Sequence, residues 1–149
     1  MSRLACVLLL GAAACSGDAR PEVDVGALAI ADTMRQAEAA YDVGAFDSIS
    51  WANADKAAER GAVVFRFSCE KCHGMRGYGN GGFVAQGDTV RPPSFRDADW
   101  RFANDHEGLR RHIFIGTAEG MPHWGLEGLK PRDIDAVAYY LRGPLRTGP

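Results

Sequence analysis

The sequence of 149 residues predicts one all-helical domain with long loops and an N-terminal extension. Segments of the C-terminal two-thirds place apolar residues at helical spacing, and no segment alternates as a strand would. Long stretches rich in glycine and proline separate these segments. Loops of that length are unusual in a compact domain, so we expect them to pack on a large buried group.

Residues 1–15 are typical of an export signal. Arg3 precedes the apolar run Leu4–Leu10, which is too short to span a bilayer, and small residues follow it. The sequence up to Cys15 resembles a bacterial lipoprotein signal, in which the cysteine becomes the lipidated N-terminus, although Ala12 replaces the usual leucine. The alternative is ordinary cleavage that leaves a soluble protein. Both interpretations predict export to the periplasm or to a membrane surface that faces it, and we favour membrane attachment through lipidated Cys15.

Residues 16–50 form an acidic extension with seven acidic residues and two arginines. Asp24 is placed to cap a helix that runs towards Tyr41. This helix carries one apolar stripe at 3.6-residue spacing, formed by Ala27, Ile30, Met34, Ala37 and Tyr41. We expect the extension to fold against its own domain or to tether it to a membrane, and docking on a partner subunit is the alternative.

Residues 51–147 form the predicted domain. Its first helix begins at Asn53 or Asp55 and runs directly into Cys69. Gly61 lies on the apolar face of this helix, where glycine costs about 1 kcal/mol relative to alanine. We therefore expect another helix to cross closely over Gly61.

Two further helices are predicted in the domain. Asn104, with Glu107 three residues later, matches a capping box, and the helix that it opens stops near Gly116. The last helix begins at Pro131, which suits a first turn, and ends at Gly143.

The sequence Cys69-Glu70-Lys71-Cys72-His73 is a C-x-x-C-H motif, the attachment site of c-type haem. Each thiol can form a thioether with a vinyl group of one porphyrin, and the histidine supplies the proximal ligand of the iron. A closed zinc site would need four ligands, and no second cysteine pair follows the motif. The motif therefore predicts one covalently bound haem c.

An ordered set of residues resembles a class I (mitochondrial-type) cytochrome c domain over Trp51–Arg146, about two-thirds of the chain. The set comprises Gly61 and Phe65, Cys69-x-x-Cys72-His73-Gly74, Pro93, Met121-Pro122 and Tyr140-Leu141. The resemblance implies a cytochrome c fold, in which about three to five helices with long loops wrap around one covalent haem. It also implies that the first and last helices cross, with Val137 and Tyr140 at the contact.

Met121 is the best candidate for the sixth iron ligand, opposite His73. Its thioether is soft and neutral, and a Met/His pair raises the reduction potential of the iron. The Gly-Met-Pro loop holds it at the spacing that the family shows. The alternative is a buried core methionine, and His123 is a rival ligand two residues away.

The resemblance implies that a backbone carbonyl of the proline loop orients the His73 ring, with Pro93 favoured over Pro92. Trp100 or Arg101 is a candidate contact of a haem propionate, since an indole N–H or a guanidinium satisfies a carboxylate. The alternative for Trp100 is a simple core aromatic.

These features together predict a one-electron carrier between redox partner proteins, without substrate chemistry of its own. The carrier is either a free or lipid-tethered shuttle or a fixed subunit of an oxidoreductase complex. A peroxidase-like or gas-binding haem is a less favoured alternative, because the sequence offers a sixth ligand. The net charge of −2 argues against a nucleic-acid surface.

Overall fold

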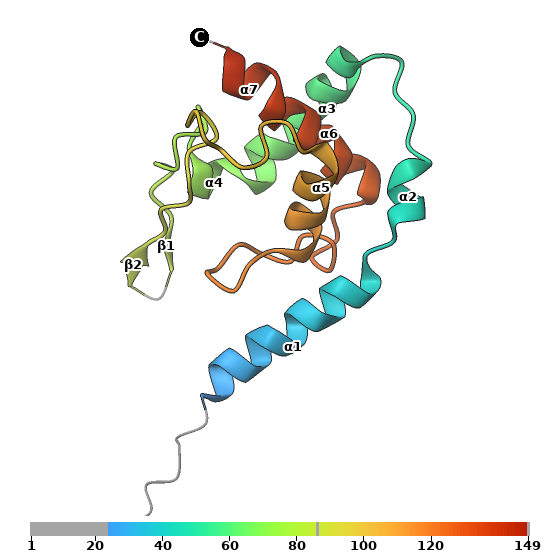
Figure 1. Cartoon of the computed structure of the whole chain (residues 1–149). Helices are drawn as coiled ribbons and strands as arrows, with labels where there is room; N and C mark the ends of the chain where they lie inside the picture. Colours follow the sequence, from blue (N-terminus) through green and yellow to red (C-terminus); the bar gives the residue numbers. More distant parts are fainter. Residues whose placement is uncertain (1–23, 86, 149) are drawn as a thin grey trace, which may run out of the picture.

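The computed structural model describes residues 24–85 and 87–148, and helices dominate them (Figure 1). The predicted export signal, including Cys15, lies outside these residues. The elements, in chain order, are α1 (Val25–Ala40), α2 (Val43–Asp47), α3 (Ala54–Ser68), α4 (Glu70–His73), β1 (Val84–Ala85), β2 (Asp88–Thr89), α5 (His106–Ile115), α6 (Pro131–Arg142) and α7 (Pro144–Thr147). Within the predicted domain the fold is helical with long loops, as a cytochrome c fold requires.

Helices α3 and α6 form the centre of the fold. A Cβ atom added to Gly61 would lie 2.1 Å from the carbonyl oxygen of Ala136 and 2.7 Å from Cβ of Tyr140. No side chain larger than hydrogen fits between the two backbones. The expected close crossing at Gly61 is therefore confirmed, and Val137 of α6 is completely buried beside it.

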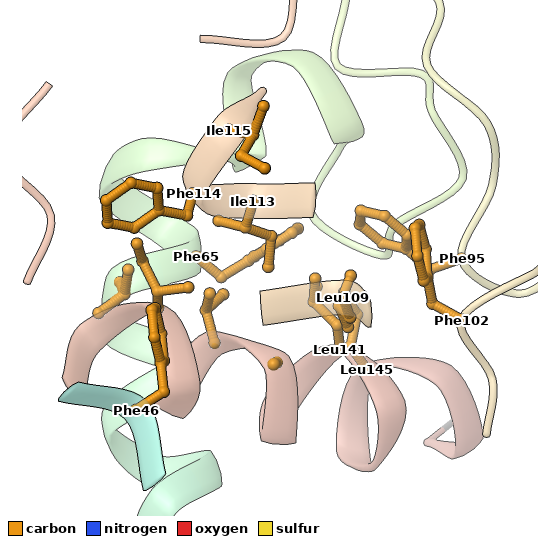
Figure 2. Close-up of a cluster of buried hydrophobic side chains, with 14 of the residues drawn as sticks. Phe46, Phe65, Phe95, Phe102, Leu109, Ile113, Phe114, Ile115, Leu141 and Leu145 are labelled. Atoms are coloured by element: carbon orange, nitrogen blue, oxygen red, sulfur yellow. The ribbon is translucent and has the colours of Figure 1, made fainter. Parts of the chain in front are cut away.

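The hydrophobic core fills the space between α3, α5 and α6 (Figure 2). Phe46 and Phe114 lie at one end of this cluster, and Phe95 and Phe102 lie at the opposite end. Leu109 of α5 lies between them and is 2 % exposed. The core therefore links the segment that follows the C-x-x-C-H motif to the end of α5 and to α2 of the extension.

The helix ends follow local capping chemistry. Asp24 accepts a hydrogen bond from the Ala27 N–H at 3.0 Å, and Asn53 accepts one from the Lys56 N–H at 2.9 Å. Helix α6 begins at Pro131 as expected. The predicted ends of these helices are confirmed to within a residue.

The capping box predicted at Asn104 is wrong. Asp105 caps α5 instead and accepts the Gly108 N–H at 2.7 Å. The cap has shifted by one residue because Asn104 still belongs to the preceding turn, where the Asp105 N–H donates to the Phe102 carbonyl. Glu107 therefore falls at the second position of α5 rather than at the third, which a capping box requires.

Two very short strands form a hairpin in the glycine-rich loop, where no strand was expected. They are antiparallel, with Val84 paired with Thr89 and Ala85 paired with Asp88. Strands of two residues are too short to show an alternation of apolar and polar residues, so this pattern could not predict them.

The N-terminal extension packs on the domain over only part of its length. Ala37 of α1 and Phe46 of α2 are 0 % and 1 % exposed, and they belong to the common core. The first half of α1 projects away from the domain, with Leu28 58 % and Ile30 42 % exposed (Figure 1). The predicted apolar stripe therefore divides into a packed half and an exposed half.

None of the helices in the described part of the chain combines the length and the apolar character needed to cross a membrane.

Candidate haem site

The C-x-x-C-H motif forms a single helical turn at the end of α3. Cys69 ends α3 with its N–H donating to the Phe65 carbonyl at 2.8 Å. The Cys69 carbonyl then accepts the N–H groups of Cys72, at 3.1 Å, and His73, at 3.0 Å. Both cysteines are free thiols and partly buried. Local backbone bonding thus brings the three predicted attachment residues together.

The glycine-rich loop folds back on this turn. Gly74 has φ 75°, a backbone conformation that favours glycine and reverses the chain after His73. Gly79 then donates its N–H to the His73 carbonyl at 2.8 Å, and Gly81 donates to the Cys72 carbonyl at 3.1 Å. The motif is therefore fixed by neighbours in the sequence.

His73 is prepared to act as a neutral ligand. Burial, together with the nearby His112, lowers the pKa of His73 to about 4, so its imidazole is neutral at pH 7. The ring stacks on Phe95, with centroids 4.4 Å apart and an interplanar angle of 20°. Its Nδ1 is buried and has no hydrogen-bond partner among the described residues.

The proline segment lies close to this histidine. A Cβ atom added to Gly79 would lie 2.0 Å from the carbonyl oxygen of Pro92, so the segment crosses directly over the loop that bonds to His73. Neither Pro92 nor Pro93 accepts a hydrogen bond from the buried Nδ1 of His73 in the described residues. The orienting role of the Pro93 carbonyl stays a prediction.

Trp100 is connected to His73 through Phe95. Its ring lies edge-on to Phe95 at 5.3 Å and to Phe102 at 6.0 Å, and it is 8 % exposed. The Arg101 guanidinium lies 4.2 Å from the centroid of the Phe102 ring. These contacts place Trp100 in the aromatic part of the core, and its contact with a propionate stays a prediction.

Met121 lies on a loop that closes back on the end of α5. The Thr117 N–H donates to the Met121 carbonyl at 3.1 Å, and the Met121 N–H donates to Oγ1 of Thr117 at 3.4 Å. Gly116 has φ 75°, and a Cβ there would lie 2.6 Å from the carbonyl oxygens of Met121 and Pro122. The Met121 side chain is partly buried and packs against the core.

His123, the rival ligand, uses one of its two ring nitrogens to bond the same loop to α5. Its Nδ1 donates a hydrogen bond to the carbonyl oxygen of Ile115, the last residue of α5. This bond ties the loop to α5 and fixes the orientation of the ring. The structure therefore gives His123 a role in holding the Met121 loop.

The surroundings of Cys69 disfavour a thiolate in this structure. Burial and the neighbouring Cys72 raise the pKa of the Cys69 thiol to about 12, so the thiol is protonated at neutral pH. Zinc ligands and catalytic cysteines are thiolates. Within residues 24–85 and 87–148, no group of three or more His, Cys, Asp or Glu side chains is arranged to hold a metal ion.

Asp135 is a polar group that the sequence analysis missed. It is 3 % exposed on α6 and accepts hydrogen bonds from Nε1 of Trp51 at 2.7 Å and Nε2 of His106 at 2.9 Å. Arg110 adds a third contact at 3.3 Å. Asp135 sits between the buried residues Ile134 and Ala136, and a charge inside the buried run of a helix was the available signal.

The residues present fit a covalently attached haem. The site offers two free thiols on one turn, a neutral imidazole whose buried Nδ1 has no partner among the described residues, and a thioether on a loop packed against the same core. A mostly helical cytochrome c fold with this donor set places the protein in the class of cytochrome c domain proteins.

Comparison with known families then identifies a particular family. The model of "Cytochrome C oxidase, cbb3-type, subunit III" matches residues 56–141, which is more than half of the chain. The matched region contains the motif, Met121 and the α3–α6 crossing. The chain belongs to this family.

Curated relatives agree with this assignment. The chain is 32 % identical over 85 residues to the cbb3-type cytochrome c oxidase subunit FixP of Azorhizobium caulinodans, and 35 % identical over 85 residues to FixP of a Bradyrhizobium species. It is 30 % identical over 83 residues to subunit CcoP of Cereibacter sphaeroides. These matches cover 56–57 % of this chain and 26 % of each relative, so the chain spans about a quarter of their length. No solved structure matches the chain.

Proposed function

We propose that this chain is a mono-haem c-type cytochrome that passes single electrons as a fixed subunit of an oxidoreductase complex. The observation that supports this most directly is the family match over residues 56–141, whose relatives are named as subunits of cbb3-type oxidases. A free or lipid-tethered shuttle is less well supported, because a shuttle has no fixed place in such a complex.

Four side chains would hold the haem. Cys69 and Cys72 would each form a thioether, and His73 and Met121 would supply the two axial ligands. When bound, haem c supplies a reversible one-electron centre whose potential depends on its axial ligands. The chain itself has no open catalytic position in this arrangement, so we propose no substrate reaction for it.

The surrounding residues would orient the site and keep it dry. Phe95 stacks on one face of His73 and fixes the plane of the ring. We propose that the Pro93 carbonyl accepts the Nδ1–H of His73, which supports the basicity of a metal-bound histidine. Trp100 lies next to Phe95, and we propose that its indole N–H reaches a propionate.

We also propose that residues 16–50 form an extension and residues 51–147 a cytochrome domain. Residues 1–15 would direct export, and Cys15 would be lipidated. The haem would then face the periplasm on a membrane-attached protein. Replacing Cys15 with serine should let a salt wash release the protein from membranes, because contacts with partner subunits alone would then hold it there. Continued sedimentation with membranes after detergent-free salt washing would contradict lipidation as the anchor.

The complex is tested in membranes of the source organism separated on a native gel and stained for haem. An antibody to this chain should recognise a haem-stained band far heavier than the 16.1 kDa chain. The double variant Cys69→Ala with Cys72→Ala serves as the control for haem carried by other subunits. Migration of all recognised protein as a single free chain would favour the shuttle.

A further inference from the structure

Three aromatic rings join the N-terminal extension to the end of α5. Tyr41 and Phe46 lie 5.1 Å apart between ring centroids, and Phe114 lies 5.4 Å from Tyr41 and 6.1 Å from Phe46. Both contacts of Phe114 are edge-on, an arrangement that aromatic pairs prefer. We call Tyr41–Phe46, the chain that supplies two of the rings, the strap.

The ring of Phe114 in turn presses on the loop that carries Met121. A Cβ atom added to Gly125 would lie 2.4 Å from three ring atoms of Phe114. The Gly125 N–H also donates to the Phe114 carbonyl at 3.0 Å. The loop therefore packs on Phe114 in two ways, through the backbone bond and through the ring that the strap supports.

Other contacts fix the strap in place at both ends. Before it, Glu38 of α1 pairs with Arg111 of α5. Within it, the guanidinium of Arg110 lies 5.2 Å from the centroid of the Phe46 ring. Arg110 is anchored by the buried Asp135, which connects the strap to α6.

The strap lies outside the region that the family model matches, which begins at residue 56. We propose that Tyr41 and Phe46 are positioning residues that act through Phe114 and Gly125 to hold the Met121 loop, and so keep Met121 on the iron. The proposal rests on the proposed function for the identity of the ligand. The contacts between the strap, Phe114 and the loop do not depend on which residue binds the iron.

A purely structural role is the competing explanation, because two buried rings stabilise any core. The two explanations differ in where the effect appears. A structural role predicts that all amides exchange faster together when a ring is removed. A positioning role predicts that the loop 117–129 opens while α3 and α6 stay protected.

The test uses the full-length haem-loaded protein with Tyr41→Leu and Phe46→Leu, which keep an apolar side chain and remove the ring. Tyr41→Phe is the matched control, since it keeps the ring and removes a hydroxyl that is buried without a hydrogen-bond partner among the described residues. Val64→Ala is the second control, because it removes buried volume from α3 outside the three rings.

Hydrogen exchange of the 117–129 peptides is the first readout. We expect exchange about tenfold faster in both leucine variants, because losing an aromatic pair shifts such an opening equilibrium by roughly that factor. Tyr41→Phe should match the wild type. Equal acceleration in the loop and in α3 and α6, or acceleration by Val64→Ala to the same degree, would overturn the proposal. Should Phe46→Leu fail to fold, Tyr41→Leu alone decides the result.

Imidazole binding to the ferric protein is the second readout, since added imidazole competes with Met121 only when the loop opens. We expect roughly tenfold tighter binding in the leucine variants, in proportion to the open population. Unchanged affinity in both variants, with the loop still exchanging at the wild-type rate, would overturn the proposal.

Met121→Ala distinguishes a wrong ligand from a wrong role of the strap. Iron bound by a methionine sulfur gives a characteristic absorption band in the ferric protein. If Met121→Ala keeps this band, Met121 is not the ligand. Hydrogen exchange of the loop then still decides whether the strap holds it. If Met121→Ala abolishes the band and the leucine variants change neither exchange nor imidazole binding, the ligand is right and the strap is wrong.

Discussion

The C-x-x-C-H turn and the Met121 loop are held by different kinds of contact. Around His73, backbone bonds connect residues that are close in sequence, such as Gly79 N–H to the His73 carbonyl at 2.8 Å. Around Met121, the contacts reach back through Phe114 to Tyr41, in a segment that precedes the family region. Phe95, which stacks on His73, and Phe114, which packs on the Met121 loop, lie at opposite ends of the core in Figure 2.

One end of the proposed site is thus held mostly by contacts between neighbours in the sequence, and the other also by contacts between distant segments. The attachment turn is held mainly by backbone bonds within its own sequence and the following glycine loop, with Phe95 stacked on His73, so we expect it to tolerate changes in the N-terminal extension. The Met121 loop depends on contacts with α5, which the extension and α6 contact in turn. We therefore expect the two ends of the site to respond differently to substitution.

The largest effect should come from the attachment turn itself. Replacing Cys69 and Cys72 with alanine removes both thioether bonds, so no haem should remain with the polypeptide after denaturation. Haem staining of a denaturing gel measures this directly, with Ser68→Ala as the neighbouring control. Undiminished staining of the double variant would contradict the attachment site.

The next effect should come from the helix crossing that supports both ends. Gly61→Val places a side chain where only 2.1 Å separates a Cβ position from the Ala136 carbonyl, and we expect a loss of about 3 kcal/mol in the free energy of unfolding. Urea unfolding measures it. Gly44→Ala is the control, because a Cβ there would lie 3.3 Å from the Asp42 side chain alone and meets no backbone of another element, so it should shift the midpoint far less. A wild-type midpoint for Gly61→Val would refute the close crossing.

A more selective effect is expected at the second end. Met121→Ala should keep the covalent haem and lower the reduction potential by on the order of 0.1 V or more, because the axial ligand sets the potential. Potentiometric titration measures the shift. Met75→Ala, at an exposed methionine two residues after His73, should leave the potential unchanged. An unchanged potential in Met121→Ala would transfer the ligand role to another residue.

The smallest effect should come from Asp135, which ties α6 to α5 and Trp51. Burial alone would raise the pKa of Asp135, but hydrogen bonds from His106, Trp51 and Arg110 outweigh it and hold the pKa below its usual range. Because the folded-state pKa is the lower one, its stabilisation is present above about pH 4 and is lost as the pH falls through the folded-state value.

Asp135→Asn should therefore cost about 1–3 kcal/mol of unfolding free energy at neutral pH, and the cost should shrink below about pH 4. Urea unfolding at several pH values measures both quantities. Asp32→Asn, an exposed residue of α1, is the control. A cost that stays constant down to pH 3 would contradict the assigned role of the carboxylate.

Sequence reasoning located the features that depend on local chemistry. The cap at Asn53, the start of α6 at Pro131 and the close contact at Gly61 follow from residue type and spacing, and all three are present in the structure. The cap of α5 was placed one residue early, because neighbouring Asn104 and Asp105 both suit a cap and only the preceding turn decides between them.

The partners that meet through distant contacts could not be predicted from the sequence. Asp135 is satisfied by Trp51, His106 and Arg110, which come from different parts of the chain, and its burial follows from their meeting. The division of the α1 stripe at about Ile30 depends on where the domain surface ends. The engagement of His123 by Ile115 likewise requires the loop to fold back on α5.

The central claim is that His73 and Met121 hold one covalently attached haem for electron transfer. Absorption spectra recorded during a redox titration of the haem-loaded protein test it most directly. The account predicts a low-spin spectrum with a thioether band in the ferric form, a positive potential, and no change on adding carbon monoxide to the ferrous form. A high-spin spectrum, or a ferrous form that binds carbon monoxide, would contradict it and favour a catalytic or gas-binding haem.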